Sequence, residues 1–134
     1  MQVLNGREEE IVNMLKDFGL CEYEAKMYFT LLAIGEAKVM EITRKASVPQ
    51  SKAYNVLESL RAKGYVELSR IERPKKYRAR VLKEVTDITI REKRRRIREL
   101  EESRRKLFEI LQAIVPIHRM YNGLRLFSPS YKRR

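Results

Sequence analysis

The sequence contains few of the residues from which catalytic and metal-binding sites are usually built. Its 134 residues include one cysteine, Cys21, one histidine, His118, and no tryptophan. A single cysteine excludes an internal disulfide bond and a cysteine cluster for zinc, and His118 is more simply explained as a heptad or surface residue than as a ligand. A nucleophile–histidine pair and a glycine-rich phosphate loop are also missing. We therefore predict neither an enzyme nor a bound metal or other cofactor.

Signals for export or membrane insertion are equally scarce. The first ten residues, MQVLNGREEE, are too charged for a secretory signal peptide. No apolar run approaches the roughly 20 residues that are needed to cross a bilayer. The sequence thus predicts a cytoplasmic protein that is not inserted in a membrane.

Basic residues, by contrast, are in large excess. The formal net charge is +12. Residues 1–48 carry a net charge of −2, residues 49–80 one of +6 and residues 81–134 one of +8. So large an excess in a short chain predicts a polyanionic partner, either nucleic acid or an anionic membrane surface.

Hydrophobic periodicity and glycine stops predict four helices followed by two strands in the first part of the chain. We expect helices over residues 7–18, 22–34, 39–46 and 49–63, and strands over residues 65–71 and 76–81. The apolar residues that recur at helical spacing in the first two helices are Ile11, Met14, Leu15, Phe18, Ala25, Tyr28, Phe29 and Leu32. Gly64 is placed to end the fourth helix in a left-handed backbone conformation. This order predicts a mainly α fold with a small β-hairpin, a winged helix-turn-helix domain over residues 1–81.

The fourth expected helix has an apolar face and a polar face. At 100° per residue, Ala53, Val56, Leu57 and Leu60 share the apolar face, opposite Ser51, Asn55, Glu58 and Ala62. Helix-turn-helix proteins read bases with the N-terminal part of their second helix. The candidate DNA contacts there are Gln50, Ser51, Lys52, Tyr54 and Asn55. Amide side chains pair with adenine, lysine donates to guanine and hydroxyl groups bind phosphate, although a merely solvated face explains the helix alone equally well.

The segment between the two expected strands favours the DNA interpretation. Five basic residues fall within eight positions, with Glu72 and Tyr77 among their neighbours. They are Arg73, Lys75, Lys76, Arg78 and Arg80. A basic hairpin tip beside a groove-facing helix is what phosphate or minor-groove contact requires. We add Arg73, Lys75, Lys76 and Arg78 to the candidate DNA contacts.

A long coiled-coil helix is expected to follow, reaching Val115 before Pro116. The expected dimerisation segment is residues 82–118, and a basic tail of residues 119–134 follows, with a turn signal at Asn122-Gly123. The heptad track is Ile90, Lys93, Ile97, Leu100, Arg104, Leu107, Leu111, Ile114 and His118. We predict a homodimer whose interface includes Ile97, Leu100, Leu107, Leu111 and Ile114, with its main seam between Leu107 and Val115.

Residues 91–106 of this helix, REKRRRIRELEESRRK, hold nine basic and four acidic side chains. Charged outer positions of a coiled coil explain this composition. The alternative is that Arg94, Arg95, Arg96 and Arg98 add phosphate contacts or repel a parallel partner helix.

Three separated segments resemble the N-terminal domain of the TrmB family of archaeal transcription regulators. They are GLCEYEAKMYFTLL, GEAKVMEITRKASVPQSKAYNVLESLRAKGYVEL and RPKKYRA, within residues 10–90. The resemblance implies a dimeric winged-helix DNA-binding domain, with the helix that opens at Pro49-Gln50-Ser51-Lys52 entering the major groove. The sequence departs from the family at Lys38, where a capping Thr or Ser is usual, at Gln50, where Arg is frequent, and at Glu72, where a wing glycine is common. The family's usual sugar-sensing domain is not among these 134 residues, so no small-molecule effector is predicted.

These observations together predict a homodimeric transcription regulator that binds specific double-stranded DNA sequences. One alternative is a chromatin-type protein that coats DNA without strong sequence preference. Another is a membrane-surface or protein-interaction module that uses the basic amphipathic helix. An RNA target is the last alternative, although no aromatic stacking platform is visible.

Overall fold

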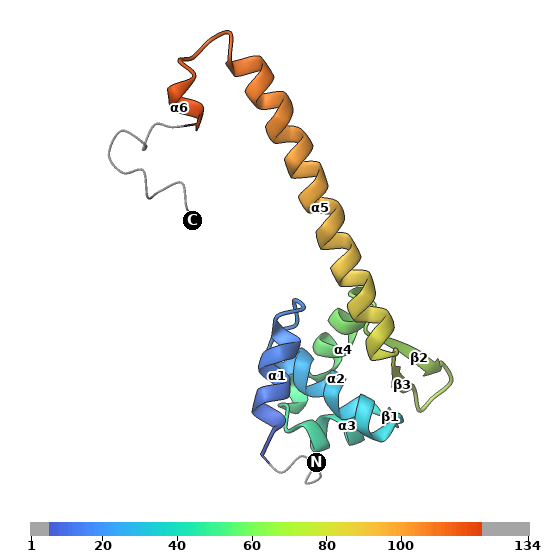
Figure 1. Ribbon diagram of the computed structural model, residues 1–134. Coiled ribbons are helices and arrows are strands. Elements are labelled where there is room, and N and C mark those ends of the chain that lie inside the picture. Colours follow the sequence, from blue (N-terminus) through green and yellow to red (C-terminus); the bar gives the residue numbers. More distant parts are fainter. Residues whose placement is uncertain (1–5, 122–134) are drawn as a thin grey trace. The chain divides into compact units, whose positions relative to one another are not determined.

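The computed structural model describes residues 6–121. In chain order the elements are α1 (Glu8–Lys16), α2 (Glu22–Ile34), β1 (Glu36–Lys38), α3 (Val39–Ala46), the 3₁₀ helix η2 (Gln50–Lys52), α4 (Ala53–Ala62), β2 (Val66–Arg70), β3 (Lys76–Ala79), α5 (Leu82–Leu111) and α6 (His118–Tyr121) (Figure 1). The chain divides between Ile90 and Arg91 into two compact units, here called the winged-helix unit and the C-terminal unit. The predicted winged helix-turn-helix fold with a long C-terminal helix is confirmed.

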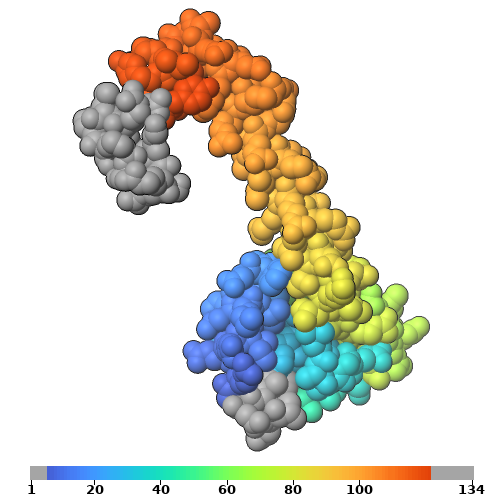
Figure 2. Space-filling model, in the orientation of Figure 1, coloured from blue at the N-terminus to red at the C-terminus, as the bar shows by residue number. Residues whose placement is uncertain are grey.

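The core of the winged-helix unit forms around α2. The hydrophobic residues whose exposed fraction is 0% are Ala25, Met27, Tyr28, Leu31, Ile42, Leu57 and Leu60. Helix α1 packs against α2 (Figure 2) and buries Val12 and Leu15. Only one narrow stripe of α1 faces α2. Met14 lies about 160° around the helix from Val12, and its side chain is therefore 58% exposed. Helical spacing alone therefore does not bring Met14 into the core, and Leu32, in the last turn of α2, is also 39% exposed.

The sheet has three strands where the sequence predicted two. Its strand order is β1-β3-β2, and both pairs are antiparallel. The missed strand, β1, is only three residues long, and Ala37 is its one buried side chain. Its partner strand lies about 40 residues later in the sequence, so neither alternation nor a local turn signal marks it.

The recognition helix consists of η2 followed by α4 and begins with a tighter turn than expected. The amide of Lys52 donates to the carbonyl of Pro49 at 2.9 Å, an i to i−3 bond of the 3₁₀ type. Gly64 follows the helix at φ +85°, and the amide of Tyr65 bonds back to the carbonyl of Leu60 at 2.9 Å. The predicted left-handed stop at Gly64 is confirmed, and the chain passes directly into β2.

A buried carboxylate joins α2 to the far end of the recognition helix. The Glu24 side chain is only 4% exposed, and its Oε1 accepts a hydrogen bond from Lys63 Nζ at 2.7 Å. The same carboxylate accepts from the backbone amide of Cys21 at 2.8 Å and from the Ser59 hydroxyl. Burial acts to raise the pKa of Glu24, but the hydrogen bonds from Lys63 and Ser59 outweigh it, so the pKa is lowered from its ordinary value.

Replacing Glu24 by glutamine is expected to destabilise the fold by about 1–3 kcal/mol at pH 7, since the ion pair is lost while half-exposed Lys63 regains water. A group whose pKa is lowered in the folded state stabilises the fold above its unfolded pKa and loses that effect as the pH falls. The difference in unfolding free energy between wild type and Glu24→Gln should therefore become smaller below about pH 4. Urea unfolding at pH 7 and at pH 3 measures this difference. Glu72→Gln, at a site that is 82% exposed, is the control, and an equal loss there would contradict the account.

Helix α5 ends earlier than expected. Its last helical residue is Leu111, not Val115, and a turn follows in which the Ile114 amide donates to the carbonyl of Leu111 at 2.8 Å. Pro116 disfavours a helical conformation at the residue before it, which accounts for an end ahead of that proline. The short helix α6 comes next, and the ring of its Tyr121 meets the ring of Phe108 edge-on at 5.0 Å. The Asn122-Gly123 turn signal and most of the expected basic tail lie outside the described residues.

Candidate nucleic-acid interface

The outer face of the recognition helix is polar and accessible. Its exposed side chains near the N-terminal end are Gln50, Ser51, Lys52, Tyr54 and Asn55. The opposite face is buried, as the predicted periodicity requires, because Ala53, Val56, Leu57 and Leu60 enter the core. All five candidate residues of this helix are thus exposed.

Two side chains of the recognition helix, Gln50 and Glu58, are held in place by neighbours. The amide nitrogen of Gln50 lies 3.0 Å from the sulfur of Met40 on α3. Glu58 bonds to Arg61 at 3.1 Å and accepts a hydrogen bond from the buried hydroxyl of Tyr77 at 3.3 Å. Burial, together with the Glu58 charge, raises the pKa of Tyr77. The hydrogen bond from Tyr77 to Glu58 ties β3 to α4, which fixes the wing beside the recognition helix.

The sheet register gathers three cations in one row. Lys38 of β1 and Arg70 of β2 are the partners of Lys76 on either side of β3. Like charges placed opposite each other destabilise a sheet. Sequence reasoning missed Lys38 because β1 was not recognised as a strand, and it missed Arg70 because the register of the hairpin, which shifts between Leu68 and Arg70, was not predicted.

A hollow of about 630 Å³ joins the recognition helix to the wing, here defined as β2, β3 and the turn between them. Its lining residues are Lys38, Val39, Met40, Tyr54, Arg73, Pro74 and Lys75. Tyr54 comes from α4, whereas Arg73 and Lys75 come from the wing turn, so the fold brings together the two segments that the sequence singled out. Three cations around one open hollow form a surface suited to an anion.

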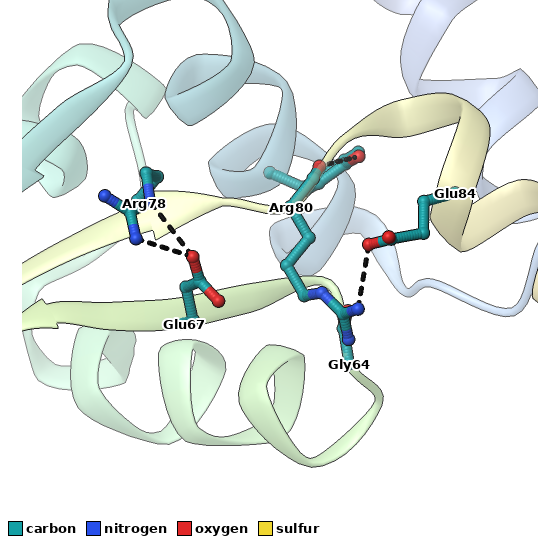
Figure 3. Close-up of polar contacts among 6 residues, drawn as sticks. Gly64, Glu67, Arg78, Arg80 and Glu84 are labelled. Atoms are coloured by element: carbon teal, nitrogen blue, oxygen red, sulfur yellow. Dashed lines mark hydrogen bonds and ion pairs between the residues drawn. The ribbon is translucent and has the colours of Figure 1, made fainter.

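Arg78 of β3 and Arg80, the residue that follows β3, are already paired. The Arg78 guanidinium donates to the Glu67 carboxylate through Nε at 3.0 Å and Nη2 at 2.8 Å (Figure 3). Arg80 bonds to Glu84 at 2.8 Å, while its own carbonyl accepts a hydrogen bond from Tyr28 at 2.9 Å. Of the four predicted wing contacts, Arg78 is thus the one whose charge is already compensated by a carboxylate.

The cations without an ion pair are unevenly distributed over the winged-helix unit. In its described residues, no carboxylate lies within 4.0 Å of seven basic side chains. They are Lys38, Arg44, Lys45, Lys52, Arg73, Lys75 and Lys76. Five of the seven belong to the recognition helix, the wing or the sheet row beside it; Arg44 and Lys45 lie in the last turn of α3. Positive charge that the protein leaves uncompensated is therefore concentrated where the two candidate segments meet.

The sequence profile described as "Sugar-specific transcriptional regulator TrmB" matches residues 15–82 of this chain. The chain belongs to the TrmB family. The predicted resemblance is thereby confirmed, and because the family consists of transcriptional regulators, so is the prediction that the protein is not an enzyme. Among residues 6–121, no three His, Cys, Asp or Glu side chains are grouped so that they could hold a metal ion.

Members of the TrmB family from Pyrococcus furiosus are similar to this chain. The sugar-sensing regulator TrmBL1 is 43% identical over 61 residues, which are 46% of this chain and 18% of that protein. TrmBL2 is 30% identical over 112 residues, 82% of this chain and 42% of that protein. A solved structure of TrmBL2, described as an archaeal chromatin protein with a novel mode of DNA binding, has a TM-score of 0.72 at 28% identity, over 81% of this chain and 43% of that one. The chain spans less than half the length of each of these relatives.

One departure from the TrmB pattern has a visible structural counterpart. Lys38 is the N-cap residue of α3, and its side chain makes no capping hydrogen bond. A Thr or Ser at this position would satisfy a free backbone amide of the first turn. Here the position instead supplies one of the cations of the sheet row and of the hollow.

Proposed function

We propose that this TrmB-family chain binds double-stranded DNA as a transcription regulator, through the recognition helix and the wing. The observation that carries the proposal is the concentration of unpaired cations around the hollow between these two segments. Duplex DNA presents a dense row of phosphates, and Lys or Arg side chains that neutralise them release bound counterions. A DNA partner also agrees with the expected cytoplasmic location; none of the described helices is long and apolar enough to cross a membrane.

The wing would position the protein on the duplex, and the recognition helix would contact the bases. Arg73, Lys75 and Lys76 of the wing would hold phosphates and set the register of the protein on the duplex. Gln50 and Asn55, exposed on the recognition helix, carry the amide groups that pair with adenine through two hydrogen bonds. Ser51 and Tyr54 add hydroxyl groups for the phosphates beside the groove, and Lys52 can donate to guanine.

Asn55→Ala is expected to weaken binding to the preferred DNA sequence by about 1–3 kcal/mol, with little change on other sequences, because only a base contact depends on the sequence. Lys76→Ala should weaken binding to all duplexes alike and lower the salt slope of binding by about 1. Titrations of both variants against the selected site and a scrambled duplex compare them. Equal losses on every duplex would show that Asn55 does not read a base.

We further propose that the protein acts as a homodimer through the C-terminal unit. Apolar residues at heptad spacing on α5, such as Ile97 at 55% and Leu107 at 52% exposure, have no cover among the described residues. A partner helix would bury them at a gain of about 1.5–3 kcal/mol for each fully covered side chain. The proposed interface residues are Ile97, Leu100, Leu107, Leu111 and, in the turn beyond the helix, Ile114. Two copies could then meet successive major grooves, about 34 Å apart.

A second candidate function is the coating of DNA without strong sequence preference. It is favoured by the likeness to TrmBL2, described as a chromatin protein, over 81% of this chain. Competition between one selected duplex and random DNA at rising salt separates the two functions. A regulator continues to bind its selected duplex more tightly than random DNA as the salt rises. The affinity of a coating protein falls by the same factor for both kinds of DNA. No binding to any duplex at low salt would contradict both.

A further inference from the structure

Six of the nine basic residues of α5 between Arg91 and Lys106 form two groups, and Lys93, Arg104 and Lys106 belong to neither. In the first group, two arginines repeat one arrangement, in which each lies between a glutamate three residues earlier and one four residues later. Arg95 bonds to Glu92 at 2.7 Å and to Glu99, and Arg105 bonds to Glu102 and Glu109 at 2.5 Å each. Arg96 also lies 3.5 Å from Glu99. The charges of these arginines are therefore compensated within the helix.

The second group contains three arginines on one face. Arg91, Arg94 and Arg98 are all exposed and fall within about 60° of each other around the helix axis. No carboxylate of the described residues lies within 4.0 Å of any of them. Glu101, one turn after Arg98, forms no ion pair with them, and Asp87, one turn before Arg91, pairs with Lys83 at 2.7 Å. We call these three residues the arginine stripe.

The stripe has the chemistry and the spacing of a phosphate-binding surface. Like charges three and four residues apart on a helix repel each other, so an external anion would stabilise this face. From Arg91 to Arg98 the helix rises about 10.5 Å, close to the rise over three phosphates of one DNA strand at about 3.4 Å each. Guanidinium groups bind phosphate through two parallel hydrogen bonds.

We propose that the arginine stripe is a second binding surface for the phosphates of duplex DNA, separate from the recognition helix and wing. This inference rests on the proposed DNA binding. The stripe lies about 140° around α5 from the seam of Ile97, Leu100 and Leu107, so a dimer formed through that seam leaves it accessible. An anionic membrane fits less well, because a membrane-bound helix must insert its apolar face, which is here the proposed seam.

The experiment compares two triple variants of the full chain that lose the same charge from the same helix. R91Q/R94Q/R98Q removes the stripe, whereas R95Q/R96Q/R105Q removes the three arginines that are paired to glutamates. Binding to a fluorescent duplex is measured over a series of salt concentrations. The stripe variant is expected to bind at least about 10-fold more weakly, with a salt slope lower by about 2–3. The control should keep both values close to those of the wild type.

Each other outcome has a distinct meaning. An equal weakening in both triple variants would attribute the effect to net charge, and an unchanged slope in the stripe variant would also overturn the inference. Failure of the wild type to bind any duplex would remove the proposed function itself. Glutamine favours helices, so circular dichroism should show that the helix content of the triple variant is unchanged. If the triple variant unfolds, the single variant R94Q must still lower the salt slope of duplex binding by about 0.9. Stripe-dependent binding to phosphatidylserine vesicles but not to DNA would reassign the surface to membranes.

Discussion

Replacing Arg73, Lys75 and Lys76 together by glutamine is expected to abolish tight DNA binding while the fold remains intact. None of the three has an ion-pair partner among the described residues, and Arg73 and Lys75 line the hollow beside Tyr54. At about 0.9 counterions released per neutralised phosphate, the salt slope should fall by roughly 2.7 per protomer. Fluorescence anisotropy with a labelled duplex at about 0.15 M salt should show a loss on the order of 100-fold.

The matched control removes three positive charges from the same unit, away from this surface. K16Q/K26Q/K83Q changes lysines that are each paired with a carboxylate, Lys16 and Lys26 with Glu22 and Lys83 with Asp87. Its affinity and salt slope should stay near those of the wild type. If the two variants weakened equally, binding would depend on total charge, and the wing would have no special role.

Replacing Leu107 by glutamate is expected to convert the proposed homodimer into a monomer. The Leu107 side chain lies at the apolar part of the heptad track and is 52% exposed in the single chain. In a dimer the substitution would lose the burial of two leucines and place two carboxylates at one seam. We expect the dimer dissociation constant to rise at least about 100-fold. Light scattering after size-exclusion chromatography, over a range of protein concentrations, measures it.

Gln112→Glu is the control for this variant, because it adds the same charge off the heptad track. The Gln112 side chain is exposed, and its backbone amide still donates to the carbonyl of Phe108 at 3.0 Å. It should leave the molecular mass of the dimer unchanged. A monomeric wild type would contradict the proposed dimer, and a dimeric Leu107→Glu variant would place the interface elsewhere.

Local signals in the sequence were sufficient for most of the helices. Residues 22–34 and 39–46 are helical as predicted, because apolar spacing and a following glycine or turn define such helices without knowledge of the rest of the chain. Gly64 ends the recognition helix for the same reason, since its left-handed conformation is a local property. Strand β1 could not be found in this way, because its three residues become a strand only by pairing with β3.

In the candidate interface, too, some features could be predicted from local sequence signals and others depend on the fold. The polar face of the recognition helix follows from the 100° step of a helix, so Gln50, Ser51 and Asn55 could be named from the sequence and are exposed in the structure. Ion pairing could not be predicted from charge alone. Arg78 and Lys76 are two residues apart on β3, yet Arg78 is paired with Glu67 across the sheet whereas Lys76 lies between two other cations.

The main helices, the positive charge of the chain and the apolar track of α5 are encoded locally, since helical periodicity and composition involve neighbours a few residues apart. The pairing of each cation depends on strand register and on side chains that meet only after folding. Residues 91–106 illustrate the difference: the sequence shows nine basic side chains there, and the structure identifies Arg95, Arg96 and Arg105 as the ion-paired arginines. Coulomb attraction acts over a few ångströms, and the fold determines which charges come that close.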